Sequence, residues 1–172
     1  MLETLRDLVV AEKQIVENKE WSPAGRSLEI KLPLFAGEFA PEGFFFRATA
    51  IAALPDEQVT FQLEYHGVEI PGGTGPLCRL EWRPKSTHNN KGKGPADLRF
   101  IEQVGTHFHS FEENWSDKNG ALLRGNLPVA RPIAQDIQDF RDCLALVGNL
   151  FGINNILVVK TPEWVLERAL WD

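Results

Sequence analysis

Ser27-Leu28-Glu29-Ile30-Lys31-Leu32-Pro33-Leu34 is the stretch that decides the fold. Every second residue is leucine or isoleucine, and the residues between them are polar or proline. Because successive side chains of a strand point to opposite faces, this alternation predicts a half-buried strand. Pro33 has no N–H to donate to a neighbouring strand, so we expect an edge strand or a strand that ends in a bulge.

Further short strands with turn residues between them follow along the chain. The alternation is clearest at Val59–His66, and the turn before it is Pro55–Gln58. Such evenly spaced strands predict an antiparallel meander. We expect strands at Ser27–Leu34, Phe44–Ala53, Val59–His66, Cys78–Arg83 and within Phe100–Phe111.

Apolar residues at helical spacing indicate helices at both ends of the chain. Leu2 to Lys19 has this spacing, and Pro132 opens a longer helix that we expect to end near Gly152. After it we expect a last strand at Ile156–Val159 and a short helix at Pro162–Leu170. The predicted fold class is α+β, a curved antiparallel sheet of about five to six strands with a long helix packed on one face.

The length of 172 residues suits a single domain. Within it we expect an N-terminal helical region at 1–22, a mostly antiparallel sheet at 26–130 and a helical C-terminal region at 131–172. No stretch approaches the ~20 apolar residues of a membrane span, and the charged N-terminus does not look like a signal peptide. Cys78 and Cys143 lack the close spacing of a metal or redox motif, so we expect buried thiols and a cytoplasmic protein.

Charge is distributed unevenly along the chain. The formal net charge is −6, which argues against indiscriminate binding to nucleic acid or anionic membranes. From Leu77 to Arg99, however, six basic residues face only two acidic ones. A basic segment on an acidic protein indicates either one anion-recognising site or a solvated loop.

The histidine pair in Gly105-Thr106-His107-Phe108-His109 is the strongest functional signal. In a strand, His107 and His109 lie on one face, ~7 Å apart. If this strand pairs with the one before it, the imidazoles share a face with the outward side chains of that strand. The resulting candidate set is His88, His107 and His109 as catalytic residues, with Arg79, Glu81, Arg83, Asn90, Lys91 and Lys93 as substrate-binding residues.

These residue types fit more than one chemistry. As a metal-independent ribonuclease, His107 and His109 would divide the acid and base roles. Arg79 and Arg83 would bind phosphate, and the loop His88–Lys93 would close over the substrate. Alternatively, the pair would bind one divalent metal, with a third ligand from His88, Glu112 or Glu113. A binding module that uses its basic loop without catalysis, and histidines that only hydrogen-bond on a sheet face, also fit the sequence.

The order of these motifs resembles an uncharacterised family of small bacterial proteins, known as a domain of unknown function. Members show Arg-Leu-Asp, then Pro-His-x-Asn, then His-x-His, as in Arg79-Leu80-Glu81, His88-x-Asn90 and His107-x-His109 here. The match covers roughly residues 10–150. More loosely, the chain is similar to the TumE-like toxins of bacterial toxin–antitoxin systems.

The resemblance implies a role for the residues at the matching positions and, through the toxins, RNA or a small antitoxin protein as partner. It supplies no activity. Two departures from the family pattern stand out: Glu81 replaces the usual aspartate, and no proline immediately precedes His88.

Overall fold

The computed structural model describes residues 2–165 and has the expected α+β architecture. The helices are α1 (Leu5–Val10), α2 (Phe111–Asn114) and α3 (Phe140–Phe151). The longer strands are β3 (Ser27–Ala36), β4 (Phe44–Ile51), β5 (Val59–Tyr65) and β6 (Gly75–Trp82). The shorter strands are β1 (Lys13–Ile15), β2 (Ser22–Ala24), β7 (His88–Asn89), β8 (Glu102–Gln103), β9 (His107–His109), β10 (Trp115–Ser116), β11 (Ala121–Leu122) and β12 (Arg131–Pro132).

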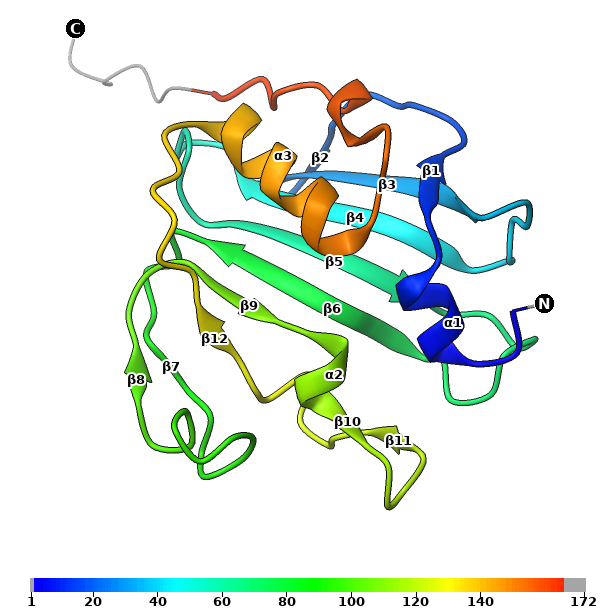
Figure 1. Cartoon of the computed structure of the whole chain (residues 1–172). Coiled ribbons are helices and arrows are strands. Elements are labelled where there is room, and N and C mark those ends of the chain that lie inside the picture. The colour runs from blue at the N-terminus through cyan, green and yellow to red at the C-terminus, as the bar shows by residue number, and fades with distance from the viewer. Residues whose placement is uncertain (1, 166–172) are drawn as a thin grey trace, which may run out of the picture.

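Eight of the strands form one open antiparallel sheet, in the order β1-β3-β4-β5-β6-β9-β12 with β2 also paired to β3 (Figure 1). This exceeds the expected five to six strands, because the short strands β1, β2 and β12 extend the predicted meander at its two edges. Two small hairpins, β7-β8 and β10-β11, lie outside the main sheet.

Neither alternative expected for β3 is found: it is not an edge strand, and its pairing with β4 runs from Ser27 to Pro33 without a bulge. β4 pairs with one side of β3, while β2 and β1 pair with the two ends of its other side. Pro33 lies where neither β1 nor β2 is in register, and its carbonyl accepts a hydrogen bond from the Val16 N–H at 3.1 Å. Since N and O of a residue in an antiparallel strand point to the same side, the missing donor of Pro33 faces this gap and breaks no ladder bond.

Helix α3 lies across one face of the sheet and closes the core (Figure 1). The Phe140 ring packs against Phe61 with a centroid distance of 5.8 Å, and the Phe151 ring packs against Phe46 at 6.4 Å. The opposite face of the sheet carries the polar residues of the same strands. One face of the sheet is therefore apolar and packs against α3, and the other face is polar.

The expected start of this helix at Pro132 is wrong. Arg131 and Pro132 pair with β9 instead, and the helix begins after Asp139, whose side chain accepts a hydrogen bond from the Asp142 N–H. An aspartate at this position satisfies an N–H that the first turn leaves free. The end at Gly152 is as expected, with φ 66° in the left-handed region.

The N-terminal helix is also shorter than the predicted Leu2–Lys19. It ends at Val10, and the chain then runs extended as β1 beside β3. The buried side chain of Lys13 donates from its Nζ to the carbonyls of Val9 and Ala11 at 2.6 and 2.7 Å, so it satisfies the end of α1. Helical spacing alone did not reveal this exit, because Lys13 and Ile15 also fit a strand.

The two C-terminal expectations are wrong as far as the described residues reach. Ile156–Val158 is a 3₁₀ turn, not a strand, and it packs against α3. Residues 162–165 are not helical, and the rest of the expected terminal helix lies outside the described residues. Within residues 2–165 there is no helix of the length and apolarity needed to cross a bilayer.

The contact between α3 and the 3₁₀ turn yields a stability prediction at Gly148. A Cβ there would lie 2.5 Å from Ile156 Cγ2 and 3.2 Å from the Ile153 carbonyl oxygen. Gly148→Ala should therefore lower the free energy of unfolding by about 1–3 kcal/mol in urea titrations, although alanine normally favours a helix. Gly75→Ala, whose Cβ would meet no atom within 4 Å, is the control and should change stability by less than about 0.5 kcal/mol. Equal effects of the two substitutions would contradict this packing.

Candidate functional site

The polar side chains of the predicted site can share one sheet face only if β6 pairs with β9, and the structure has this pairing. The two strands are antiparallel, with Glu81 opposite His107 and Arg79 opposite His109. The alternate residues of β6, Leu80 and Trp82, point into the core. The four polar side chains therefore lie together on the sheet face away from α3.

A third imidazole reaches this face from outside the main sheet. His88 lies in the β7-β8 hairpin, and its ring centroid is 5.2 Å from that of His107 and 4.8 Å from that of His109. The His107 and His109 centroids are 5.1 Å apart. One potential ligand nitrogen from each ring lies within 4.8 Å of the other two. The structure thus gathers all three histidines of the candidate set.

Backbone carbonyls determine which nitrogen of each ring carries the proton. His107 Nδ1 lies 2.8 Å from the Gly105 oxygen, and His109 Nδ1 lies 2.6 Å from the Leu127 oxygen. His88 Nε2 lies 3.0 Å from the Pro128 oxygen. A carbonyl oxygen can only accept, so each of these nitrogens donates its proton outward. The lone pairs that remain are on His107 Nε2, His109 Nε2 and His88 Nδ1, on the other side of each ring. The lone pair of His109 faces the Arg79 guanidinium, whose Nη2 lies 3.5 Å away.

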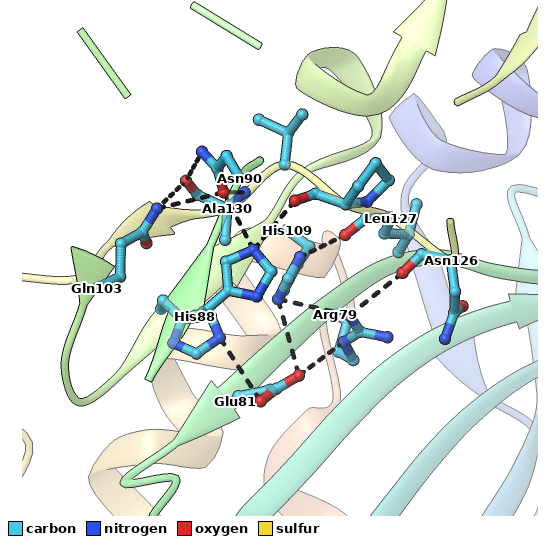
Figure 2. Close-up of polar contacts among 12 residues, drawn as sticks. Arg79, Glu81, His88, Asn90, Gln103, His109, Asn126, Leu127 and Ala130 are labelled. Atoms are coloured by element: carbon cyan, nitrogen blue, oxygen red, sulfur yellow. Dashed lines mark hydrogen bonds and ion pairs between the residues drawn. The ribbon is translucent and has the colours of Figure 1, made fainter. Parts of the chain in front are cut away.

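The segment Asn126–Pro128 supplies two of these three carbonyls and has an unusual conformation. Asn126 and Leu127 both have positive φ, 58° and 57°, which is uncommon for asparagine and strained for leucine. This conformation directs the Asn126 oxygen to the Arg79 guanidinium at 3.3 Å and the Leu127 oxygen to His109 (Figure 2). Consecutive residues of one strained segment therefore hold three side chains of the site.

Two buried asparagines hold the residues that follow. Asn114 bonds both the N–H and the carbonyl of Val129, each at 2.8 Å. Asn90 does the same for Ala130, at 2.9 Å for its N–H and 3.0 Å for its carbonyl (Figure 2). Each side-chain amide thus replaces the peptide of a missing neighbouring strand. Asn90 Oδ1 also lies 3.0 Å from His88 Nε2, so it positions an imidazole as well.

Glu81 lies beside the lone pairs of the two strand histidines. Its carboxylate oxygens are 3.5 Å from His107 Nε2 and 3.7 Å from His109 Nε2, and Arg79 Nε is 3.0 Å away (Figure 2). His107 Nε2 is buried without a hydrogen-bond partner among the described residues. A carboxylate oxygen and an imidazole lone pair cannot bond each other directly. A proton or a cation between them would satisfy both.

The charges of the site follow from its surroundings. A hydrogen bond from His107, formed when its Nε2 carries a proton, and the charge of the Arg79 guanidinium hold the pKa of the Glu81 carboxyl well below its usual range, against the opposing effect of burial. Burial, together with the positive charge of Arg79, holds the pKa of His109 well below that of a free imidazole. At neutral pH the site therefore presents an ionised carboxylate and a neutral His109.

The remaining candidates lie apart from this cluster. Arg83 leaves the end of β6 and donates to the carbonyls of Asp56 and Ile137, so it does not face the imidazoles. Lys91 is exposed in the loop after β7, and Lys93 Nζ donates to the Arg124 carbonyl at 3.0 Å.

The alternative third ligands Glu112 and Glu113 are likewise elsewhere. Glu112 pairs with Arg6 at 3.1 Å, and Glu113 pairs with Arg131 at 2.6 Å. Of the three residues considered as third metal ligand, only His88 lies beside His107 and His109.

Asn114 and Asn126 were not among the predicted site residues. Asn114 is buried and holds both main-chain groups of Val129. The neighbouring Glu112 and Glu113 make the sequence of this turn polar, so the burial of Asn114 could not be predicted locally. Nothing local in the sequence marks Asn126, since its role comes from its backbone conformation.

Comparisons with family models, with curated proteins and with solved structures found no match to this chain. The resemblance inferred from motif order therefore stays a prediction, and the functional argument rests on the geometry of the site.

The clamp by Asn90 predicts a large stability effect. Asn90→Ala removes bonds to the N–H and carbonyl of Ala130 and leaves these buried groups without their partner, so unfolding free energy should fall by about 2–3 kcal/mol. The neighbouring Asn89 is exposed, and its side chain accepts only from the Lys91 N–H. Asn89→Ala should cost less than about 1 kcal/mol. Chemical denaturation of the two variants checks this, and a loss of similar size in both would refute the clamp.

Proposed function

We propose that this protein is a metal-dependent hydrolase in which His88, His107 and His109 bind one divalent transition-metal ion, with Zn²⁺ as the reference ion. The observation that carries the proposal is the fixed orientation of the three rings. Histidines that bind metals characteristically donate the other ring N–H to a carbonyl or carboxylate, as all three rings do here.

The donor set fits such an ion if the three rings move closer together and the Arg79 guanidinium moves away from His109 Nε2. Three imidazole nitrogens at the usual 2.0–2.1 Å from a tetrahedral zinc would lie about 3.4 Å apart. The present nitrogens lie within 4.8 Å of one another, so binding would draw the rings together.

Three protein nitrogens leave a coordination position for water, which is the arrangement of catalytic zinc sites. A bound ion lowers the pKa of such a water to near 7 and so supplies hydroxide at neutral pH. Glu81 is the residue placed to accept the proton of that water, because it is ionised, adjacent to the imidazoles and held by Arg79. Its side chain is 26% exposed, which gives it contact with solvent.

Burial favours this function over direct acid–base catalysis by the strand histidines. The side chains of His107 and His109 are 1% and 0% exposed. An imidazole that transfers protons to a polynucleotide must touch it, whereas a metal ligand needs no such contact. The metal-independent ribonuclease and the non-enzymatic binding module stay predictions. In the ribonuclease, Glu81 and His107 would share a proton, because they lie close together.

Metal binding is tested by titrating Co²⁺ and Zn²⁺ into protein stripped with a chelator. We expect one ion per chain, visible absorption typical of tetrahedral Co²⁺, and a thermal midpoint that rises with Zn²⁺ concentration. His88→Gln, His107→Gln and His109→Gln should each weaken binding by at least about tenfold. His66→Gln is the matched control, because His66 bonds Glu64 outside the cluster. Binding that survives all three cluster substitutions would contradict the site.

Glu81→Gln separates the proton acceptor from the ligands. If Glu81 acts on the water, the variant should keep its affinity for Co²⁺ while hydrolysis by the zinc-loaded protein falls by about 10²–10⁴. The substrates to compare are bis(p-nitrophenyl) phosphate, p-nitrophenyl acetate and mixed cellular RNA. Cleavage of RNA that persists in chelator would instead support the metal-independent ribonuclease. Loss of Co²⁺ affinity in Glu81→Gln would make Glu81 a fourth ligand.

A further inference from the structure

A depression of about 250 Å³ adjoins the site on the polar face of the sheet. Glu81 forms part of its wall, and the same carboxylate contacts the two strand histidines. The other polar residues that line it include Thr49, Thr60, Lys85 and Ser86. The depression is therefore the recess through which solvent and small molecules reach the carboxylate.

Strand register aligns this recess with the imidazoles. Thr49 is opposite Thr60, Thr60 is opposite Glu81, and Glu81 is opposite His107. Directly opposite residues of an antiparallel sheet have Cβ atoms about 4.5–5.5 Å apart, so this row crosses four strands without a gap. The hydroxyl groups of Thr49 and Thr60 thus lie in one row with the Glu81 carboxylate and the candidate metal ligand His107.

A parallel row on the same face adds positive charge. Gln62 is opposite Arg79, and Arg79 is opposite His109. The Arg79 guanidinium neutralises Glu81, which is the only acidic residue lining the recess. Lys85 adds an ammonium group at the rim. Hydroxyl and cationic donors around a neutralised carboxylate favour a ligand that is an anion with several acceptor oxygens.

We propose that this recess is the substrate subsite and that it selects esters of phosphate, with Thr60 and Lys85 binding the nonbridging oxygens. This inference rests on the proposed function, because it places the phosphoryl group beside Glu81 and the metal. The subsite is small, so it recognises the phosphoryl group itself and is indifferent to whether that group belongs to a nucleotide or to another phosphoester.

Inorganic phosphate is the probe for this subsite, titrated into cobalt-loaded protein and followed by calorimetry and by the Co²⁺ absorption spectrum. We expect saturable phosphate binding that perturbs the spectrum. Thr60→Val, which keeps a β-branched strand residue, and Lys85→Gln should each weaken binding by about fivefold to tenfold. Lys91→Gln changes an exposed lysine of the loop after β7, outside the recess, and should alter phosphate binding by less than about twofold.

The two readouts keep the inferences apart. Wild-type protein that binds Co²⁺ normally but no phosphate would overturn the subsite and leave the metal site intact. Phosphate binding that is equal in Thr60→Val, Lys85→Gln and wild type would place the anion on the metal alone and overturn the role of the recess. Failure to bind Co²⁺ would overturn the proposed function and this inference with it.

Discussion

The register between β6 and β9 is the constraint on which the site depends. Because side chains alternate between faces, a slip of one residue would send Glu81 and Arg79 into the core and bring Leu80 and Trp82 to the polar face. The burial of Leu80 and Trp82 against α3 excludes that slip, since it would bury two charges and expose two large apolar groups. The apolar core thus fixes the position of a polar site that it does not touch.

A second constraint acts from the opposite side of the imidazoles. The carbonyls of Leu127 and Pro128 accept from His109 and His88, and Asn90 and Asn114 hold the next two residues in place. The left-handed conformation of Leu127 is strained, and such a conformation persists only where the surrounding contacts hold it. Every carbonyl from Asn126 to Ala130 accepts a hydrogen bond from a side chain, and these bonds hold the segment in this conformation. We infer that the segment exists to orient the rings.

The sequence was most informative where periodicity and chemistry coincided. Alternation at β3 and β5 located the strands, and the spacing of His107 and His109 placed them on one face, as the structure has them. Helix ends were less predictable, because Lys13 and Pro132 are compatible with both helix and strand until their partners are known. Arg83 illustrates the same limit: it continues the outward set of β6 in sequence, but a positive φ of 47° turns it away.

The site could be assembled from sequence only as far as residue type and strand order allowed. His88 belonged to the candidate set, yet its place against His107 depends on a hairpin held by Asn90. The carbonyl partners were invisible, because every residue has a carbonyl and only the fold selects three of them. Residue identity therefore supplied the ligands, and backbone conformation supplied the orientation that makes them converge.

The most direct test of this account is ¹⁵N NMR of the imidazole groups in metal-free and zinc-bound protein near neutral pH. The account predicts His107 and His109 protonated on Nδ1, His88 protonated on Nε2, and zinc-induced shifts at the three remaining nitrogens with His66 unchanged. Rings of His107 and His109 that carry protons on both nitrogens, together with spectra that zinc leaves unaltered, would contradict it.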